Sequence, residues 1–290
     1  MTLDDFYAKL GLPDKAKLGA RLFKKQLLDN AELSSADRQL ITDQIETLEW
    51  RYAIKPATVA IARYDDDERD YGEIALLHVE LKNSVPVTQL KRLGELLQRA
   101  IQYPLILIIV ANEVVDAASA NVLETESTEL NVVASVPSAT QITTQLAICM
   151  ADKRINRADT SKLTIFRTVD TGWLKLGSLN LIEQAFIADF SFSICMQQHL
   201  FSLYADFSRC ITALVCARMT GQYHRSTTDQ IDQQRQEIVQ AMRQVENQLA
   251  SQRAMLKTET QFNRQLTLNV QIKQLQQTMS EYTVQLINSK

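Results

Sequence analysis

The last sixty or so residues of the chain contain no proline and carry two apolar rows at helical spacing. The first row follows a heptad-like pattern and consists of Ile231, Ile238, Met242, Val245, Leu249 and Leu256. The second row alternates strictly between steps of four and three residues and consists of Leu268, Ile272, Leu275, Met279, Tyr282 and Leu286. Apolar residues at this spacing form the contact stripe of paired helices. This part of the chain is therefore restricted to long helices that pack against one another.

The two rows are out of phase, because continuing the first would place its next members at 263 and 270 rather than at 268. Such a shift arises either from a slip within one long coiled coil or from a turn between two helices. We favour a turn near Lys257, where Thr258 and Gln261 could cap a new helix. The prediction is a coiled-coil helical hairpin, in which each row is buried against the other.

The first half of the chain alternates helix-like and strand-like segments. Amphipathic helices are predicted over residues 35–48 and 87–101, where apolar side chains recur every three or four residues. Strands are predicted at residues 58–64, 73–81, 105–110, 132–136, 144–150 and 163–169. The run from 105 to 110 is continuously apolar, which is typical of a strand buried on both faces. We expect an α/β domain with a mixed sheet and flanking helices.

Three parts are predicted along the chain. Residues 1–175 form the α/β domain, residues 176–222 form an apolar helical connector packing on it, and residues 223–290 form the coiled-coil arm. Gly221 is the expected end of the connector's last helix, since glycine commonly follows a helix C-terminus. The predicted fold class is thus α/β followed by an all-helical C-terminal region.

Composition limits the classes of function. The chain has 290 residues and a formal net charge of −3, which argues against a surface that is basic throughout and binds nucleic acid everywhere. The N-terminal residues lack the basic start and apolar core of a signal peptide. The apolar segment 186–203 includes Asp189 and His199, which are costly inside a bilayer. We expect a cytoplasmic protein that does not span a membrane.

The sequence offers little for a metal or cofactor site. Four cysteines show no Cys-x-x-Cys spacing, and three scattered histidines show no metal-ligand pattern. Seven glycines are spread thinly, without the Gly-x-x-x-x-Gly-Lys loop of nucleotide-binding proteins. We therefore predict no metal site and no cofactor, and we lean towards a protein that is not an enzyme.

One local pattern does suggest chemistry, at the end of the predicted strand 73–81. Glu80 and Lys82 form the Glu-x-Lys pattern with which restriction-type nucleases hold a divalent metal, and Asp70 or Glu73 could supply the upstream acid. Mg²⁺ would be required only under this hypothesis. The alternative is an ordinary solvent-facing strand end, because Glu-x-Lys also occurs by chance in many strands.

A second candidate is a basic loop between two predicted strands. Its four cations are Lys153, Arg154, Arg157 and Lys162, which could contact phosphate groups. The alternative is a solvated hairpin turn in which Asp152 and Asp159 balance half of that charge.

Several segments together resemble the bacterial family called domain of unknown function 4391, over nearly the full length of the chain. The matching pieces are residues 48–52 with 54–58, 151–159, 171–174, 183–186, 220–221, and 259–264 with Leu268 and Asn269. The resemblance implies a companion of helicase and DNA-methyltransferase genes in bacterial defence loci, and it carries no catalytic residue across. It draws attention to eight candidate interaction positions: Lys153, Arg154, Asp159, Glu259, Gln261, Asn263, Arg264 and Asn269.

Three functions follow as hypotheses. The first is a non-catalytic accessory subunit of an anti-phage DNA-processing system, which binds the helicase or methyltransferase and, through its basic loop, DNA. The partner would dock on Glu259, Gln261, Asn263, Arg264 and Asn269 of the helical arm, or the arm would form a homodimer. The second is the metal-dependent nuclease, and the third is a homo-oligomeric scaffold without a nucleic-acid role.

Overall fold

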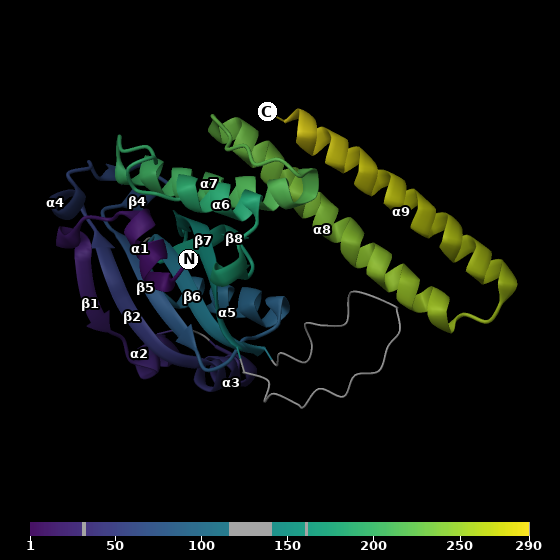
Figure 1. Cartoon of the computed structure of the whole chain (residues 1–290), viewed down its shortest axis with the longest axis horizontal. Helices are drawn as coiled ribbons and strands as arrows, with labels where there is room; N and C mark the ends of the chain where they lie inside the picture. The colour runs from purple at the N-terminus through teal and green to yellow at the C-terminus, as the bar shows by residue number, and fades with distance from the viewer. Residues whose placement is uncertain (31–32, 116–140, 160–161, 290) are drawn as a thin grey trace, which may run out of the picture. The chain divides into compact units, whose positions relative to one another are not determined.

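The computed structural model describes residues 1–30, 33–115, 141–159 and 162–289 (Figure 1). The chain divides into two compact units. The α/β unit comprises Met1–Asn180 and Phe190–Ala205, and the helical unit comprises Leu181–Asp189 and Asp206–Lys290. Each is described separately below.

The α/β unit is built on a mixed sheet that has seven strands within the described residues. The strand order is β1-β2-β5-β6-β7-β8, and β9 pairs with β7. The strands are β1 (Lys17–Arg21), β2 (Ile45–Ile54), β5 (Ile74–Leu81), β6 (Leu105–Val115), β7 (Gln141–Ile155), β8 (Leu163–Asp170) and β9 (Leu174–Lys175). The pair β5–β6 is parallel and the other pairs are antiparallel. The parallel pair explains why β6 is continuously apolar, since Leu105–Ile109 is buried on both faces.

One face of the sheet carries a large hydrophobic core. It is covered by α2 (Lys24–Asn30), α3 (Ser35–Gln44) and α5 (Val87–Ala100) (Figure 1). Helix α5 connects the two parallel strands, and its Leu90, Leu93 and Leu97 pack into this core. The buried amide of Gln98 donates to the carbonyls of Leu105 and Cys149, at 3.0 Å each, and so joins α5 to β6 and β7.

The opposite face of β5 is met by α1 (Leu3–Leu10). This helix begins with a capping box, in which Thr2 and Asp5 bond each other's backbone N–H, and it ends at Gly11 in the left-handed region. Its Phe6, Tyr7 and Leu10 are buried. The Phe192 N–H donates to the Leu10 carbonyl at 2.8 Å, which attaches residues 190–205 to α1.

Short elements complete the α/β unit. They are the 3-10 helices η1 (Asp14–Ala16) and η3 (Leu176–Ser178), the helix α4 (Pro56–Val59), and a small hairpin of β3 (Tyr64–Asp65) and β4 (Asp70–Tyr71). Rings of this hairpin pack on the 190–205 segment, where Tyr64 stacks on His199 with centroids 4.6 Å apart. The hairpin is thereby held by aromatic contacts as well as by its own two strands.

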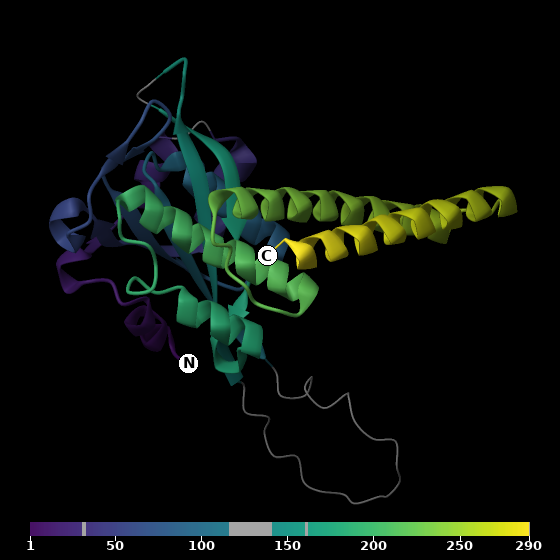
Figure 2. The same cartoon turned by 90° about the horizontal axis from the view of Figure 1, so that it is seen from above.

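The helical unit contains α6 (Leu181–Asp189), most of α7 (Leu200–Thr220), α8 (Asp229–Thr258) and α9 (Phe262–Asn288). After residues 259–261 the chain reverses, and α9 runs back along α8 (Figures 1 and 2). Five buried residues form the core of this unit: Cys216, Ile238, Val239, Met242 and Leu286.

Helix α7 is the one helix among the described residues that is long and apolar enough to cross a membrane, and 72% of its most apolar window is buried inside the structure. Burial on that scale is also typical of the core helix of a globular protein.

The predicted fold class is confirmed: a mixed sheet with flanking helices precedes C-terminal helices. The coiled-coil packing of α8 and α9 and the domain boundaries at 175 and 222 stay predictions. Two local predictions are wrong. The helix expected over 35–48 ends at Gln44, and the strand expected over 58–64 is largely replaced by the end of α4 and irregular chain. The strand expected at 132–136 lies outside the described residues.

Candidate functional site

Glu80 lies at the exposed end of a hydrogen-bonded chain of side chains. Its carboxylate accepts a hydrogen bond from the Thr47 hydroxyl at 2.7 Å and lies 3.5 Å from Nε2 of His78. Nδ1 of His78 lies 2.7 Å from the hydroxyl of Tyr7, which is buried in α1. Burial raises the pKa of Tyr7, so its hydroxyl stays protonated. Because the Glu80 carboxylate beside Nε2 is an acceptor, it favours an imidazole proton on Nε2, which leaves Nδ1 to accept from the Tyr7 hydroxyl. His78 then carries its proton on Nε2, facing Glu80.

Burial also lowers the pKa of His78 below 6.5, although the neighbouring Glu80 opposes this effect. The imidazole is 3% exposed and therefore neutral at pH 7. A neutral, buried histidine between a tyrosine and a carboxylate fixes the position of Glu80. Thr47, His78 and Tyr7 each have a structural role in this chain of hydrogen bonds.

The other residues of the nuclease hypothesis do not converge on Glu80. Glu73 precedes β5 and pairs with Lys55 at 3.0 Å, whereas Glu80 is near the far end of the same strand. Seven residues of extended chain separate the two carboxylates by roughly 20 Å, at about 3.3 Å per residue. Asp70 lies in β4 and contacts Arg63 at 3.6 Å. Lys82 donates to the Thr42 carbonyl at 3.3 Å.

A divalent metal needs several oxygen ligands within one small sphere. Within residues 1–30, 33–115, 141–159 and 162–289, no group of three or more histidine, cysteine, aspartate or glutamate side chains is arranged to hold a metal ion. Of the two acids considered for the nuclease hypothesis, Glu73 lies at the other end of β5 from Glu80, and Asp70 lies in β4 beside Arg63.

The basic loop between β7 and β8 is balanced by acidic side chains. Nη1 of Arg154 donates to Glu68 at 2.9 Å, and its guanidinium lies 4.0 Å over the ring of Phe166. Lys162 pairs with Asp159 at 3.5 Å. Arg157 is almost fully exposed and reaches Glu68 at 4.0 Å. Arg157 and Lys162 are the cations that this loop presents to solvent most fully, and Phe166 is an exposed aromatic neighbour that the sequence pattern did not indicate.

Lys153 requires a correction, because it cannot contact phosphate from the position that it occupies. Its side chain is 3% exposed. Its ammonium donates to the carbonyl of Ile101 at 2.8 Å and to that of Tyr103 at 2.7 Å, just beyond the C-terminus of α5. Cations favour that position because the last carbonyls of a helix lack partners within the helix. Burial lowers the pKa of Lys153 to about 7, since the ammonium has lost its water.

Beside this lysine lies an aromatic groove of about 510 Å³. Its lining comes from four separate segments and consists of Leu22, Phe23, Leu27, Trp50, Leu77, Ala100, Ile101, Gln102 and Tyr103. Trp50 and Tyr103 meet edge to face, with ring centroids 5.4 Å apart. Phe23 is 64% exposed and Tyr103 is 42% exposed. Large aromatic side chains left at the rim of an apolar groove are typical of a binding surface.

Hydrogen bonds hold the Tyr103 wall of the groove in place. Lys153 donates to the carbonyls of Ile101 and Tyr103, and both polar atoms of the Gln102 side-chain amide form hydrogen bonds. The Gln102 amide nitrogen donates to the Arg99 carbonyl at 2.9 Å, and its oxygen accepts from the Leu163 N–H at 2.7 Å. The wall is therefore fixed to the sheet before any partner arrives, which reduces the entropy lost on binding.

In the helical unit, the polar residues of the predicted docking edge have two roles. The Glu259 carboxylate accepts from the N–H groups of Thr260 and Gln261, at 2.9 Å each, and lies 3.8 Å from Arg264. These bonds lower the pKa of Glu259 and close the turn between α8 and α9. Asn263 and Asn269 are exposed. Glu259 is thus a structural residue of the turn, while the two asparagines are exposed to solvent.

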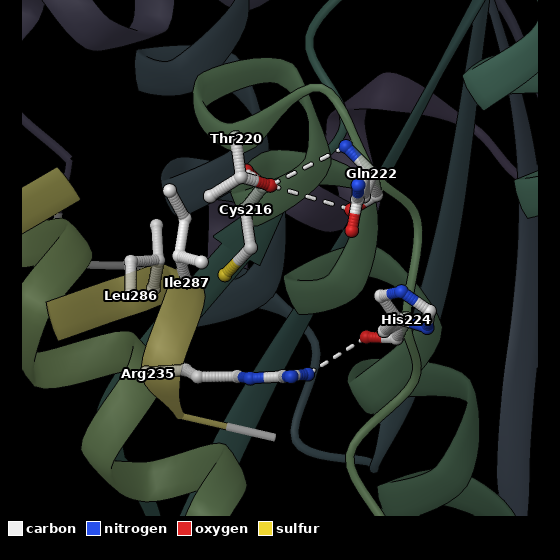
Figure 3. Close-up of a pocket in the computed structure, with 7 residues that line it drawn as sticks. All are labelled: Cys216, Thr220, Gln222, His224, Arg235, Leu286 and Ile287. Carbon is white, nitrogen blue, oxygen red and sulfur yellow. Dashed lines mark hydrogen bonds between the residues drawn. The ribbon is translucent and has the colours of Figure 1, made fainter. Parts of the chain in front are cut away.

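A small cavity lies near the C-terminal end of α9 (Figure 3). Its volume is about 90 Å³, well below the roughly 300–1,000 Å³ of ligand pockets. Arg235, which is 4% exposed, donates from Nη1 to the His224 carbonyl and from Nε to the Ser289 carbonyl, at 2.7 Å each. Burial raises the pKa of the lining Cys216 to about 12, so its thiol is inert. At this cavity, the hydrogen bonds of Arg235 connect the end of α9 to the segment that contains His224.

The sequence patterns did not indicate this groove. Its parts come from the segment between β1 and α2 together with α2, from β2, from β5, and from the end of α5 with the residues that follow it, so no spacing links them. The available signals were local. Phe23 stands beside two lysines, and Tyr103 stands between the end of a helix and Pro104.

Comparison with known protein families shows the family of the chain. The model of the family described as "Domain of unknown function (DUF4391)" matches residues 10–279. The chain therefore belongs to this family, as the resemblance led us to expect. No curated protein matches the chain. No solved structure matches it.

Proposed function

We propose that the chain is a non-catalytic, cytoplasmic accessory subunit of a bacterial DNA-processing defence system. It binds the helicase or the DNA methyltransferase of that system, and the aromatic groove of the α/β unit is the main contact. The observation that carries the proposal is the pair of exposed rings, Phe23 and Tyr103, at the rim of a preformed apolar groove. The defence setting rests on the resemblance of the chain to its family.

The groove has the properties of the centre of a protein interface. Binding energy at such interfaces concentrates in a few tryptophan, tyrosine and arginine side chains around a desolvated pocket. Here Trp50 and Tyr103 meet edge to face in the lining, and Phe23 is a third aromatic ring of the same groove. The occupant that fits is an apolar side chain of the partner, such as leucine or phenylalanine, inserted between the three rings.

Other contacts in the proposal are secondary. Asn263 and Asn269 of α9 supply exposed amides for a polar contact with the partner. For DNA, the contact is limited to Arg157 and Lys162, because these are the most exposed cations of the loop, whereas Arg154 is 32% exposed and Lys153 is buried. Two phosphate contacts give weak, strongly salt-dependent binding, which becomes useful when the partner already holds the DNA.

The test is co-purification of the tagged full-length chain from its native locus. We expect the helicase or methyltransferase to be recovered with the wild type, and recovery to fall at least about tenfold for Phe23→Ser and Tyr103→Ala, since hot-spot truncations cost about 2 kcal/mol or more. The matched control is Phe166→Ala, because Phe166 is 62% exposed and lies outside the groove. Failure to recover either enzyme with the wild type would contradict the proposal and favour the homo-oligomeric scaffold. Equal recovery with all variants would exclude the groove as the contact.

A further inference from the structure

Helix α9 carries a second row of residues with the four–three spacing, roughly opposite the row that faces α8. We call this the outer row; it consists of Leu266, Val270, Lys273, Gln277, Ser280, Val284 and Ile287. Its four apolar members are between 43% and 57% exposed. The row that faces α8 includes Met279, Tyr282 and Leu286, which pack on the core of the helical unit. One helix thus has two contact stripes, and only one of them is occupied within the described chain.

The surface of α9 is also unusually poor in charge for an exposed helix. Its 27 residues include three charged side chains, Arg264, Lys273 and Glu281. The 30 residues of α8 include eight: Asp229, Asp232, Arg235, Glu237, Arg243, Glu246, Arg253 and Lys257. An exposed helix usually carries charge on its solvent face. The outer row therefore has the composition of a face that packs against another helix.

We propose that a second copy of this chain covers the outer row, with the two α9 helices antiparallel and Gln277 on the two-fold axis. Counting seven residues in each direction from Gln277 brings Val270 of one copy opposite Val284 of the other. Counting four residues brings Lys273 level with Glu281. The two-fold axis produces each of these pairs twice, as in any isologous interface.

Two charges determine the orientation: Lys273 belongs to the outer row, and Glu281 lies at the edge of that row, where its carboxylate accepts a hydrogen bond from Gln277 at 3.1 Å. Parallel helices would set Lys273 against Lys273 and Glu281 against Glu281, and like charges across a helix pair are unfavourable. Antiparallel helices replace both repulsions with lysine–glutamate attractions. The valine pairs are apolar in either orientation, so they hold the helices together without selecting the direction.

The first test is sedimentation equilibrium of the full chain, whose monomer mass is 32.9 kDa. We expect the wild type to sediment as a dimer, and Val270→Asp and Val284→Asp to sediment as monomers with unchanged far-ultraviolet circular dichroism. Gln274→Asp is the control, since Gln274 is an exposed residue of the same helix outside the outer row. A wild type that is monomeric at the highest attainable concentration overturns the proposal. A dimer that survives both valine substitutions overturns it equally.

The second test concerns the direction of the helices. Lys273→Glu and Glu281→Lys should each weaken the dimer by roughly tenfold, because each turns two attractions into repulsions. The double substitution should restore wild-type affinity at low salt. If the single substitutions have no effect, the antiparallel pairing is wrong. The dimer does not depend on the partner proposed above, so co-purification with that partner can fail while both tests here succeed.

Discussion

Among single residues, Lys153 is a cation buried in the α/β unit, and burial lowers its pKa to about 7. Its ammonium is buried beside Cys149 and the end of α5, and two carbonyls replace the water that it has lost. Those carbonyls belong to Ile101 and Tyr103, which line the groove. The lysine therefore connects the charge state of the interior to the wall of the proposed binding surface.

This connection predicts a pH dependence. The pKa of Lys153 is about 7 in the folded chain and 10.5 in the unfolded chain. At a pH between these two pKa values, Lys153 is protonated in the unfolded chain and deprotonated in the folded chain. The free energy of unfolding therefore gains a contribution as pH rises above about 7, of at most about 1.4 kcal/mol per pH unit. Lys153→Met should lack this gain. Urea denaturation of both proteins at pH 7 and pH 9 measures it, and parallel pH profiles would contradict the buried ammonium.

His78 predicts a change in stability on the acidic side of the pH scale. Because burial holds its folded-state pKa below 6.5, the unfolded chain takes up a proton more readily as pH falls below about 6.5. Stability is therefore lost on acidification through that range. His78→Gln should unfold with a weaker dependence on pH between 7 and 5, whereas His224→Gln, which removes an exposed histidine, should follow the wild type. Identical curves for all three would show that His78 is not buried in its neutral form.

At the scale of elements, α5 approaches β7 closely at one glycine. A Cβ atom added at Gly94 would lie 2.9 Å from the Cys149 sulfur, closer than real side-chain contacts. Alanine favours a helix over glycine by about 1 kcal/mol, so an unobstructed Gly94→Ala would stabilise the chain. Because the new Cβ would meet the Cys149 sulfur, we expect Gly94→Ala to destabilise the chain instead. The free energy of unfolding, measured by thermal or urea unfolding, should fall by about 1–3 kcal/mol.

The cause of that loss can be isolated by a double-mutant cycle. Cys149→Ala removes the sulfur that the new Cβ would meet, so the two substitutions together should cost less than the sum of each alone. Strict additivity would mean that Gly94 is required for another reason.

The elements also explain which parts of the fold could be predicted. Helix α5 and strand β6 were predicted from strong, long periodic patterns, and both are present. Strand β2 was missed because Ile41, Ile45 and Leu48 fit a helix while Leu48, Trp50 and Tyr52 alternate as in a strand. Pairing with β1 and β5 resolves this ambiguity, and pairing is not visible in local spacing.

At the scale of the whole molecule, the candidate sites were harder to predict than the fold. Lys153 and Arg154 are neighbours in a basic loop, yet one is buried under α5 and the other lies over Phe166. The alternation of side chains along β7 separates them, so their charge alone could not predict their roles. The groove depends on four distant segments and becomes visible only when the sheet has formed.

The proposed function requires a partner protein to cover the aromatic groove. Hydrogen exchange of backbone amides, compared between the isolated chain and the complex purified from its native locus, tests it most directly. We predict slower exchange in the complex at residues 22–27 and 100–103, with unchanged exchange at residues 167–170 of β8, which lie beyond the Leu163 N–H that bonds Gln102 of the groove. A complex that forms and leaves exchange at 22–27 and 100–103 unchanged would contradict the claim.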